Sequence, residues 1–249
     1  MAGPLQLSQI SLRRGERGGA LVLGGSNSGK STLADLLGQE YVLRYRHLGA
    51  SRLILDSKPR FRAEWEMTGL SAARRYRHWD HGAVVRDSVL LQDPHDLERA
   101  LRMHSNVIIQ GESGADLGRL LAAAEAYLRR SRAGRPQLLQ VDETLDFFHT
   151  NGAARGGTDV ILRASRAGGE RGTLPLYCSQ RTKGMPPQLI EELKRCYLFL
   201  MDFEADVARL VEAGAPRDTR PPQEERQFLF WTKRDRRRWY GPYRLRLPA

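Results

Sequence analysis

Cysteine is scarce in this sequence, with two among 249 residues, and the two do not have the spacing of metal ligands. Cys178 and Cys196 both stand among apolar residues. This pattern excludes a disulfide framework and favours a reducing, intracellular environment. Apolar runs are also short, since none approaches the ~20 residues of a membrane span. The amino terminus lacks the basic start and apolar core of a signal peptide. We therefore expect a soluble, cytoplasmic protein without a membrane span.

Acidic residues are too few to balance the basic ones, with 29 Asp and Glu against 40 Lys and Arg. The net charge of +11 and the isoelectric point near 10.2 favour a polyanionic partner, either nucleic acid or an anionic membrane surface. The alternative is an arginine-rich composition inherited from a GC-rich genome. A chain of 249 residues with 41% hydrophobic content suffices for one α/β domain with a substantial core, whereas two domains would be small.

A phosphate-binding loop is the strongest motif. The apolar run 20–23 leads into the pattern G-x-x-x-x-G-K-[ST], and an apolar helix follows it, as the motif requires. Its backbone N–H groups and the helix start are suited to bind phosphate. Lys30 should reach the β- and γ-phosphates, Ser31 should offer its hydroxyl to Mg²⁺, and Thr32 is a second hydroxyl beside it. We therefore expect ATP and Mg²⁺ as ligands, with the nucleotide bound by Gly24, Gly25, Ser26, Asn27, Ser28, Gly29, Lys30, Ser31 and Thr32.

A second motif, the Walker B strand, is indicated by the apolar run 138–141 followed by two acids. In such a strand Asp142 binds Mg²⁺, usually through water, and Glu143 orients the water that attacks the γ-phosphate. Asp56, which ends the apolar run 52–55, is the one rival for this role. Gln180 ends a third apolar run and is placed to sense the γ-phosphate.

Short apolar runs alternate with helical patterns, which predicts a mostly parallel sheet covered by helices on both faces. We expect strands over 52–59, 107–110, 138–143, 173–181 and 198–201, a weak strand over 83–91, and a possible edge strand in the lead-in that contains Ile10 and Leu12. Helices are expected over 32–37, 115–130, 160–164 and 206–212, with a further helix start at 93–96. The carboxy-terminal region reads as a hairpin of 228–231 and 239–243 with a basic tip.

Basic segments are candidates for nucleic-acid contacts. The glycine-rich loop 147–157 could touch a threaded polymer through Arg155, or it is an ordinary surface connection. The aromatic residues Trp65, Tyr76, His78 and Trp79 lie among arginines without a clear period, and either stack on bases or pack in a loop. The candidate DNA contacts are Arg155, Lys233, Arg234, Arg236, Arg237 and Arg238.

The motifs and their order along the chain resemble those of the FtsK/HerA superfamily of DNA-pumping ATPases. The motifs are the phosphate loop, the strand end Leu55-Asp56-Ser57-Lys58, the strand Val141-Asp142-Glu143, and Cys178-Ser179-Gln180-Arg181 followed by Met185-Pro186-Pro187. The resemblance covers roughly residues 20–205. It implies a RecA-like core with strands inserted between the Walker elements, a sensor role for Gln180, and a ring, usually a hexamer, around DNA. The family often has Asp-Pro-Lys where this chain has Asp-Ser-Lys-Pro, and the extra domains of the cellular translocases are missing.

The small size is more similar to the genome-packaging ATPases of tailless, membrane-containing viruses. The resemblance thus implies a motor that packages double-stranded DNA, as a hexameric or pentameric ring, with capsid vertex or portal proteins as further partners and with a location in the host cytoplasm or the virion. We expect one domain, 1–249, made of a lead-in (1–19), a RecA-like core (20–205) and a basic hairpin (223–249). The alternatives are a cellular or plasmid DNA-transfer ATPase, a small-molecule kinase and a nucleotide-switched binding module.

Ring ATPases commonly place an arginine from the neighbouring subunit against the γ-phosphate. Arg166 and Arg171 are our candidates for this catalytic role, because they precede the sensor strand in a glycine-rich turn; Arg163 is less favoured. The alternative is a solvated basic helix end stabilised by the helix dipole.

Overall fold

The computed structural model describes residues 10–16, 18–57, 61–68, 71–78, 84–85, 87–91, 93–111, 114–131, 134–148, 159–166, 172–201 and 204–245. For residues 61–78, 84–85, 114–115 and 236–237 within these ranges, the backbone alone is described.

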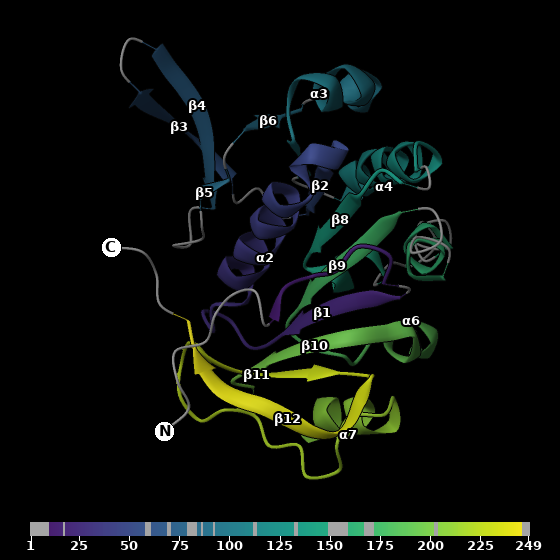
Figure 1. The fold of residues 1–249 in the computed structure, drawn as a ribbon. Helices are drawn as coiled ribbons and strands as arrows, with labels where there is room; N and C mark the ends of the chain where they lie inside the picture. The colour runs from purple at the N-terminus through teal and green to yellow at the C-terminus, as the bar shows by residue number, and fades with distance from the viewer. Residues whose placement is uncertain are drawn as a thin grey trace.

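A nine-stranded sheet forms the centre of the molecule, in the order β12-β11-β10-β1-β9-β8-β2-β7-β6 (Figure 1). From β10 to β6 all neighbouring strands are parallel, whereas β11 and β12 are antiparallel additions at one edge. The predicted RecA-like core is confirmed, with β9 inserted between β1 and β8. The bounds are β1 Gly19–Leu23, β2 Ser51–Asp56, β6 Ser88–Leu90, β7 Asn106–Gln110, β8 Gln137–Asp142, β9 Thr173–Ser179, β10 Leu193–Phe199, β11 Gln227–Thr232 and β12 Asp235–Arg244.

Both faces of the sheet are buried, because helices cover them (Figure 1). On β1, Val22 packs with helix α2 on one face, while Leu21 and Leu23 belong to the larger core on the other. The helices are α2 Lys30–Arg44, α3 Leu97–Met103, α4 Gly114–Arg129, one over 159–166, α6 Pro187–Glu192 and α7 Glu204–Glu212, with 3₁₀ turns η1 Arg46–Leu48, η2 Pro94–Asp96 and η3 Thr144–Phe147. No helix in the described part of the chain is long and apolar enough to cross a membrane.

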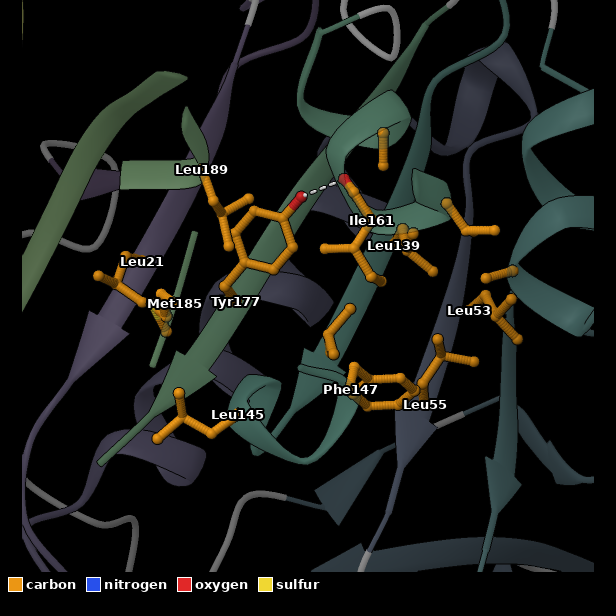
Figure 2. Packing of buried hydrophobic residues seen from close by; sticks show 14 of the residues in the cluster. Leu21, Leu53, Leu55, Leu139, Leu145, Phe147, Ile161, Tyr177, Met185 and Leu189 are labelled. Carbon is orange, nitrogen blue, oxygen red and sulfur yellow. Dashed lines mark hydrogen bonds between the residues drawn. The ribbon is translucent and has the colours of Figure 1, made fainter. Parts of the chain in front are cut away.

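The larger core lies on the face away from α2. Figure 2 shows Leu53, Leu55 and Leu139 from neighbouring strands packed with Phe147, and Tyr177 donating a hydrogen bond to the Ile161 carbonyl. That 3.1 Å bond satisfies a hydroxyl buried in apolar surroundings and ties β9 to the helix over 159–166.

A second, three-stranded sheet stands away from the central one (Figure 1). It consists of β3 Phe61–Thr68, β4 Ser71–His78 and β5 Val84–Val85, all antiparallel. This hairpin was not predicted, because the segment shows no clear period. The weak strand expected over 83–91 is two strands, since β5 pairs with β4 and β6 pairs with β7. The break falls at Asp87, whose left-handed backbone (φ 47°) ends one strand before the next begins.

Strand β10 corrects another expectation, because it spans Leu193–Phe199 rather than 198–201. Two basic residues near its start, Lys194 and Arg195, obscured the pattern. Arg195 is buried, and it forms a bidentate ion pair with Glu16 at 2.6 and 2.5 Å. The charge is thereby compensated inside the sheet. In the lead-in, Ile10 and Leu12 are buried in the core between the sheet and α2, here called the α2-side core. The described residues 10–16 nevertheless form no strand.

The carboxy-terminal hairpin was correctly expected, and the structure adds that it extends the central sheet. Phe228 of β11 pairs with Phe199 at the carboxyl end of β10, and Thr232 pairs with Arg195 near its start. The open end of the hairpin therefore lies beside the carboxyl edge of the parallel strands. Its turn at residues 233–234 lies at the opposite edge.

Candidate functional site

The phosphate loop connects the carboxyl end of β1 to the first residue of α2. It is held against its neighbours by Gly24 N–H, which donates to the Ser179 carbonyl at 3.2 Å, and by Gly25 N–H, which donates to the Leu200 carbonyl at 2.9 Å. A β-carbon at Gly24 would lie 2.5 Å from Phe199 Cβ, and Gly29 has φ 99°. Both positions therefore require glycine, one for close packing and one for its left-handed backbone.

The loop and the start of α2 offer the features of an anion site. The first N–H groups of a helix have no partner within it, and they carry the positive end of the helix dipole. Lys30 is buried, with Nζ 3.4 Å from the Gly25 carbonyl. The Ser28 hydroxyl is also buried and has no hydrogen-bond partner among the described residues. A buried donor without a partner, in a loop that no β-carbon obstructs, fits a bound phosphate.

Asp142, the last residue of β8, lies beside the start of α2. The Ser31 hydroxyl donates to Asp142 Oδ1 at 3.5 Å, so the two predicted metal-site residues come together. A hydroxyl and one carboxylate fit Mg²⁺, which is usually bound by one or two carboxylates together with water and phosphate oxygens. Among the described residues, no group of three or more His, Cys, Asp or Glu could hold a metal ion.

Glu143 is the first residue beyond β8 and has a left-handed backbone (φ 53°, ψ 65°). A non-glycine residue in this conformation is held there at a cost of about 1–3 kcal/mol. The following 3₁₀ turn η3 imposes it, because Leu145 and Phe147 are anchored in the core (Figure 2). The chain turns sharply at this point, which lets Glu143 share an edge with Asp142 although adjacent residues of a strand face opposite sides.

Gln180 follows the end of β9 and bridges the two motifs. Its Nε2 donates to Glu143 Oε2 at 2.9 Å, and its Oε1 accepts from the Ser26 hydroxyl at 3.4 Å. This bridge is possible because β9 lies between β1 and β8. The sheet thus places the predicted sensor between the phosphate loop and the predicted catalytic acid.

A buried carboxylate that the sequence analysis did not single out anchors the segment after Gln180. Asp206 of α7 accepts hydrogen bonds from Thr182 N–H, Thr182 Oγ1 and Lys183 N–H, each at 2.7 Å. Its sequence signal is weak, since an acid in the first turn of a helix is commonplace. The contacts fix the turn that carries the sensor.

A second buried group beneath the site was also missed. Arg52 of β2 is fully buried; it donates to Asp35 of α2 at 2.6 Å, and its Nε donates to Gln140 of β8 at 3.1 Å. Burial lowers the pKa of this guanidinium, and the Asp35 carboxylate opposes that shift. The network joins the helix that carries Lys30 and Ser31 to the strand that carries Asp142.

Asp56 and Cys178 have other surroundings. Asp56 is in register with Asp142 but lies one strand further from the loop, and it accepts a 2.9 Å hydrogen bond from Gln110 Nε2. Burial, and then the nearby Asp142 carboxylate, raise the pKa of the Cys178 thiol far above its usual value. Cys178 therefore has the properties of an inert core residue.

The candidate trans arginines and DNA contacts are placed only in part. Arg155 and Arg171 lie outside the described residues, as do the side chains of Arg236 and Arg237. Arg166 is exposed at the end of the helix over 159–166, whereas Arg163 contacts Glu125 at 3.3 Å.

The basic residues at the turn of the hairpin lie away from the nucleotide-site residues. Lys233 and Arg234 lie at the hairpin turn, at the edge of the sheet opposite the phosphate loop, and Lys233 Nζ donates to the Glu191 carbonyl. Arg238 lies over the Tyr240 ring, 4.9 Å from its centre.

No protein-family model matches this sequence, and no curated protein matches it either. Solved structures do match. The genome packaging NTPase B204 from Sulfolobus turreted icosahedral virus 2, in complex with ATP-gammaS, superposes with a TM-score of 0.58 at 13% identity, over 90% of this chain and 97% of that one.

Two further ATPases match as parts of longer chains. EssC (ATPases 2 and 3) from Geobacillus thermodenitrificans gives a TM-score of 0.57 at 11% identity, over 88% of this chain and 38% of that one. The cytoplasmic domain of the Thermomonospora curvata type VII secretion ATPase EccC gives 0.55 at 14% identity, over 93% and 24%. The fold implied by the sequence resemblance is therefore found, and this chain shares it with the packaging NTPase B204 and with the ATPases EssC and EccC.

Proposed function

We propose that this protein hydrolyses ATP to translocate double-stranded DNA, as the ring-shaped motor that packages a viral genome. The observation that carries the proposal is the convergence of a phosphate loop, a hydroxyl–carboxylate pair, a strained glutamate and a bridging glutamine at one edge of the sheet. Open α/β sheets bind their ligands at this carboxyl edge. The residues concerned are Lys30, Ser31, Asp142, Glu143 and Gln180.

Each residue has a distinct role in this chemistry. Lys30 and the loop N–H groups would neutralise the β- and γ-phosphates, which lowers the barrier to phosphoryl transfer. Ser31 and Asp142 would hold Mg²⁺, which when bound neutralises charge on the phosphate oxygens. Glu143 would orient and polarise the attacking water, and the Gln180 amide, now hydrogen-bonded to Glu143, lies where it can respond to a γ-phosphate.

Charge and fold together favour packaging over other uses of this core. The fold matches that of the B204 packaging NTPase over 90% of this chain and 97% of that one. The net charge of +11 suits a DNA substrate. As a motor, the protein would form a hexameric or pentameric ring around DNA and dock on capsid vertex or portal proteins, in the host cytoplasm or the virion. A cellular or plasmid DNA-transfer ATPase would share the site and differ in its docking partner.

The test is the rate of ATP hydrolysis with and without duplex DNA, alongside the mass of the assembled protein. We expect DNA to stimulate turnover. Lys30→Ala should abolish ATP binding, and Glu143→Gln should leave binding intact while removing hydrolysis, because only the water-orienting carboxylate is lost.

Three results would argue against the proposal. Unimpaired turnover in Glu143→Gln would place the catalytic acid elsewhere. Phosphate transfer to nucleosides or other metabolites would indicate a kinase. Slow hydrolysis that DNA does not change would indicate a nucleotide-switched binding module.

A further inference from the structure

The phosphate loop has a second set of neighbours, on the side away from Glu143. A β-carbon at Gly29, the last loop residue, would lie 3.2 Å from Leu245 Cδ2, 3.4 Å from Phe199 Cε1 and 3.8 Å from Arg226 Cγ. Leu245 and Arg226 belong to the carboxy-terminal hairpin, to which the proposed function assigns no role at this end.

Strand pairing places these two residues firmly at the carboxyl edge. Arg226 directly precedes β11 and Leu245 directly follows β12, and Leu245 N–H donates to the Arg226 carbonyl at 2.8 Å. The hairpin is locked to β10 by the pair Phe199–Phe228, whose rings lie 5.3 Å apart. The open end of this hairpin is therefore a fixed surface beside the phosphate loop.

The polarity of a bound nucleotide follows from the other contacts of the loop. Ser26, near its start, contacts Gln180, which in turn contacts Glu143, so the γ-phosphate end belongs on the side of β8 and β9. A nucleoside triphosphate is a linear molecule, and its nucleoside must leave from the other end of the row of phosphates. That end lies toward β10, β11 and β12, where Leu245 and Arg226 stand beside Gly29.

The chemistry of the two side chains suits a nucleobase. Leu245 is half-buried against the α2-side core and offers an apolar surface. Arg226 is exposed, its guanidinium makes no hydrogen bond or ion pair with any described residue, and a planar guanidinium stacks well on aromatic rings. Arg226 also has a left-handed backbone (φ 59°), which a glycine would adopt without strain. An arginine at such a position implies a use for its side chain.

We propose that Leu245 and Arg226 form the nucleobase platform of the ATP site, so that the carboxy-terminal hairpin recognises the nucleoside. The inference rests on the proposed nucleotide site and adds its base-binding residues. Contact through stacking and apolar packing implies weak discrimination between bases, since rejecting a base requires hydrogen bonds to its edge.

The test compares two probes, ATPγS and inorganic tripolyphosphate, both with Mg²⁺, by titration calorimetry on the full chain. Tripolyphosphate carries the three phosphates without a base. Arg226→Gly and Leu245→Ala should each weaken ATPγS binding by roughly tenfold, because one face of the base loses its contact. Tripolyphosphate should bind the variants and the wild type equally. Arg226→Gly also relieves the left-handed backbone, so loss of folding is not expected.

Arg217→Ala is the matched control, because it removes one exposed arginine from the loop that precedes β11. It should leave the affinity for both probes unchanged. Equal ATPγS affinity in Arg226→Gly, Leu245→Ala and wild type would overturn the base platform, and so would a parallel loss of both probes in either variant. Failure of the wild type to bind either probe would instead overturn the proposed ATP site.

Discussion

The fold restricts the residue type or the backbone conformation at key positions of this site. Glu143 is in a left-handed conformation, and Gly24 stands where a β-carbon would clash with Phe199. Such positions persist only when surrounding packing determines them. For Glu143 the packing comes from Leu145 and Phe147, which bury the turn that follows it (Figure 2). The geometry of the acid is thus set by core residues as well as by the strand.

Arg52 gives a stability prediction at this scale. Arg52→Met should lower the free energy of unfolding by about 3–5 kcal/mol, because it leaves the Asp35 carboxylate buried without its cation. Chemical denaturation measures the change. Arg102→Ala is the control, since it breaks an ion pair with Glu98 whose side chains are 74% and 72% exposed, and it should cost less than about 1 kcal/mol. A similar decrease in the free energy of unfolding in both variants would show that the buried Arg52–Asp35 pair stabilises the fold no more than an exposed ion pair does.

Among the elements, the carboxy-terminal hairpin has two ends in different surroundings. Its open end lies beside the phosphate loop, and its basic turn lies at the opposite edge of the sheet. One element therefore carries two candidate functions, base binding at one end and DNA contact at the other. The two can be separated by variants that change one end alone.

DNA binding by this turn is testable through salt. If basic residues of the hairpin turn and of the loop 147–157 contact phosphates, binding should be largely independent of sequence, and log K should fall with log salt by about 0.9 for each phosphate contacted. Replacing Arg155, or the cluster 233–238, should make this slope shallower. The measurement is a titration of fluorescent duplex DNA at several salt concentrations. Slopes unchanged in both variants would place the DNA path on another surface.

For the whole molecule, the expected assembly is a head-to-tail ring in which each ATP site borrows an arginine from the next subunit. Arg166 is exposed, in keeping with this role, while Arg163 already contacts Glu125. Arg171 remains a candidate from the sequence.

Mixing inactive variants tests this arrangement. Glu143→Gln should be inactive alone, as should the variant of whichever arginine is the finger, Arg166→Ala or Arg171→Ala. The equal mixture of that variant with Glu143→Gln should regain ATPase activity. Random assembly makes one half times one half, or about a quarter, of the interfaces complete. Each variant carried alone through the same subunit-exchange step controls for nonspecific recovery. If subunits exchange and the Glu143→Gln mixtures stay inactive, the arginine acts within its own subunit or neither residue is the finger.

The sequence alone determined the class of fold and supplied the candidate residues of the site. The phosphate loop and the Walker B acids were readable because each is a contiguous pattern, in which fixed residue types follow a short apolar strand. The parallel core was readable because strands buried on both faces are continuous apolar runs. Strand β10 and the hairpin β3–β4 were misread because charged residues interrupt their patterns, and for β10 the compensating partner, Glu16, is far away in the chain.

Tertiary structure alone decided which distant residues meet. The order of the strands puts Gln180 between the phosphate loop and Glu143, and packing of η3 turns Glu143 toward that edge. Pairing of β11 with β10 brings Arg226 and Leu245 to Gly29, which lies 197 and 216 residues earlier in the chain. Local patterns carry no information about such contacts, because they depend on which strands become neighbours and in what register.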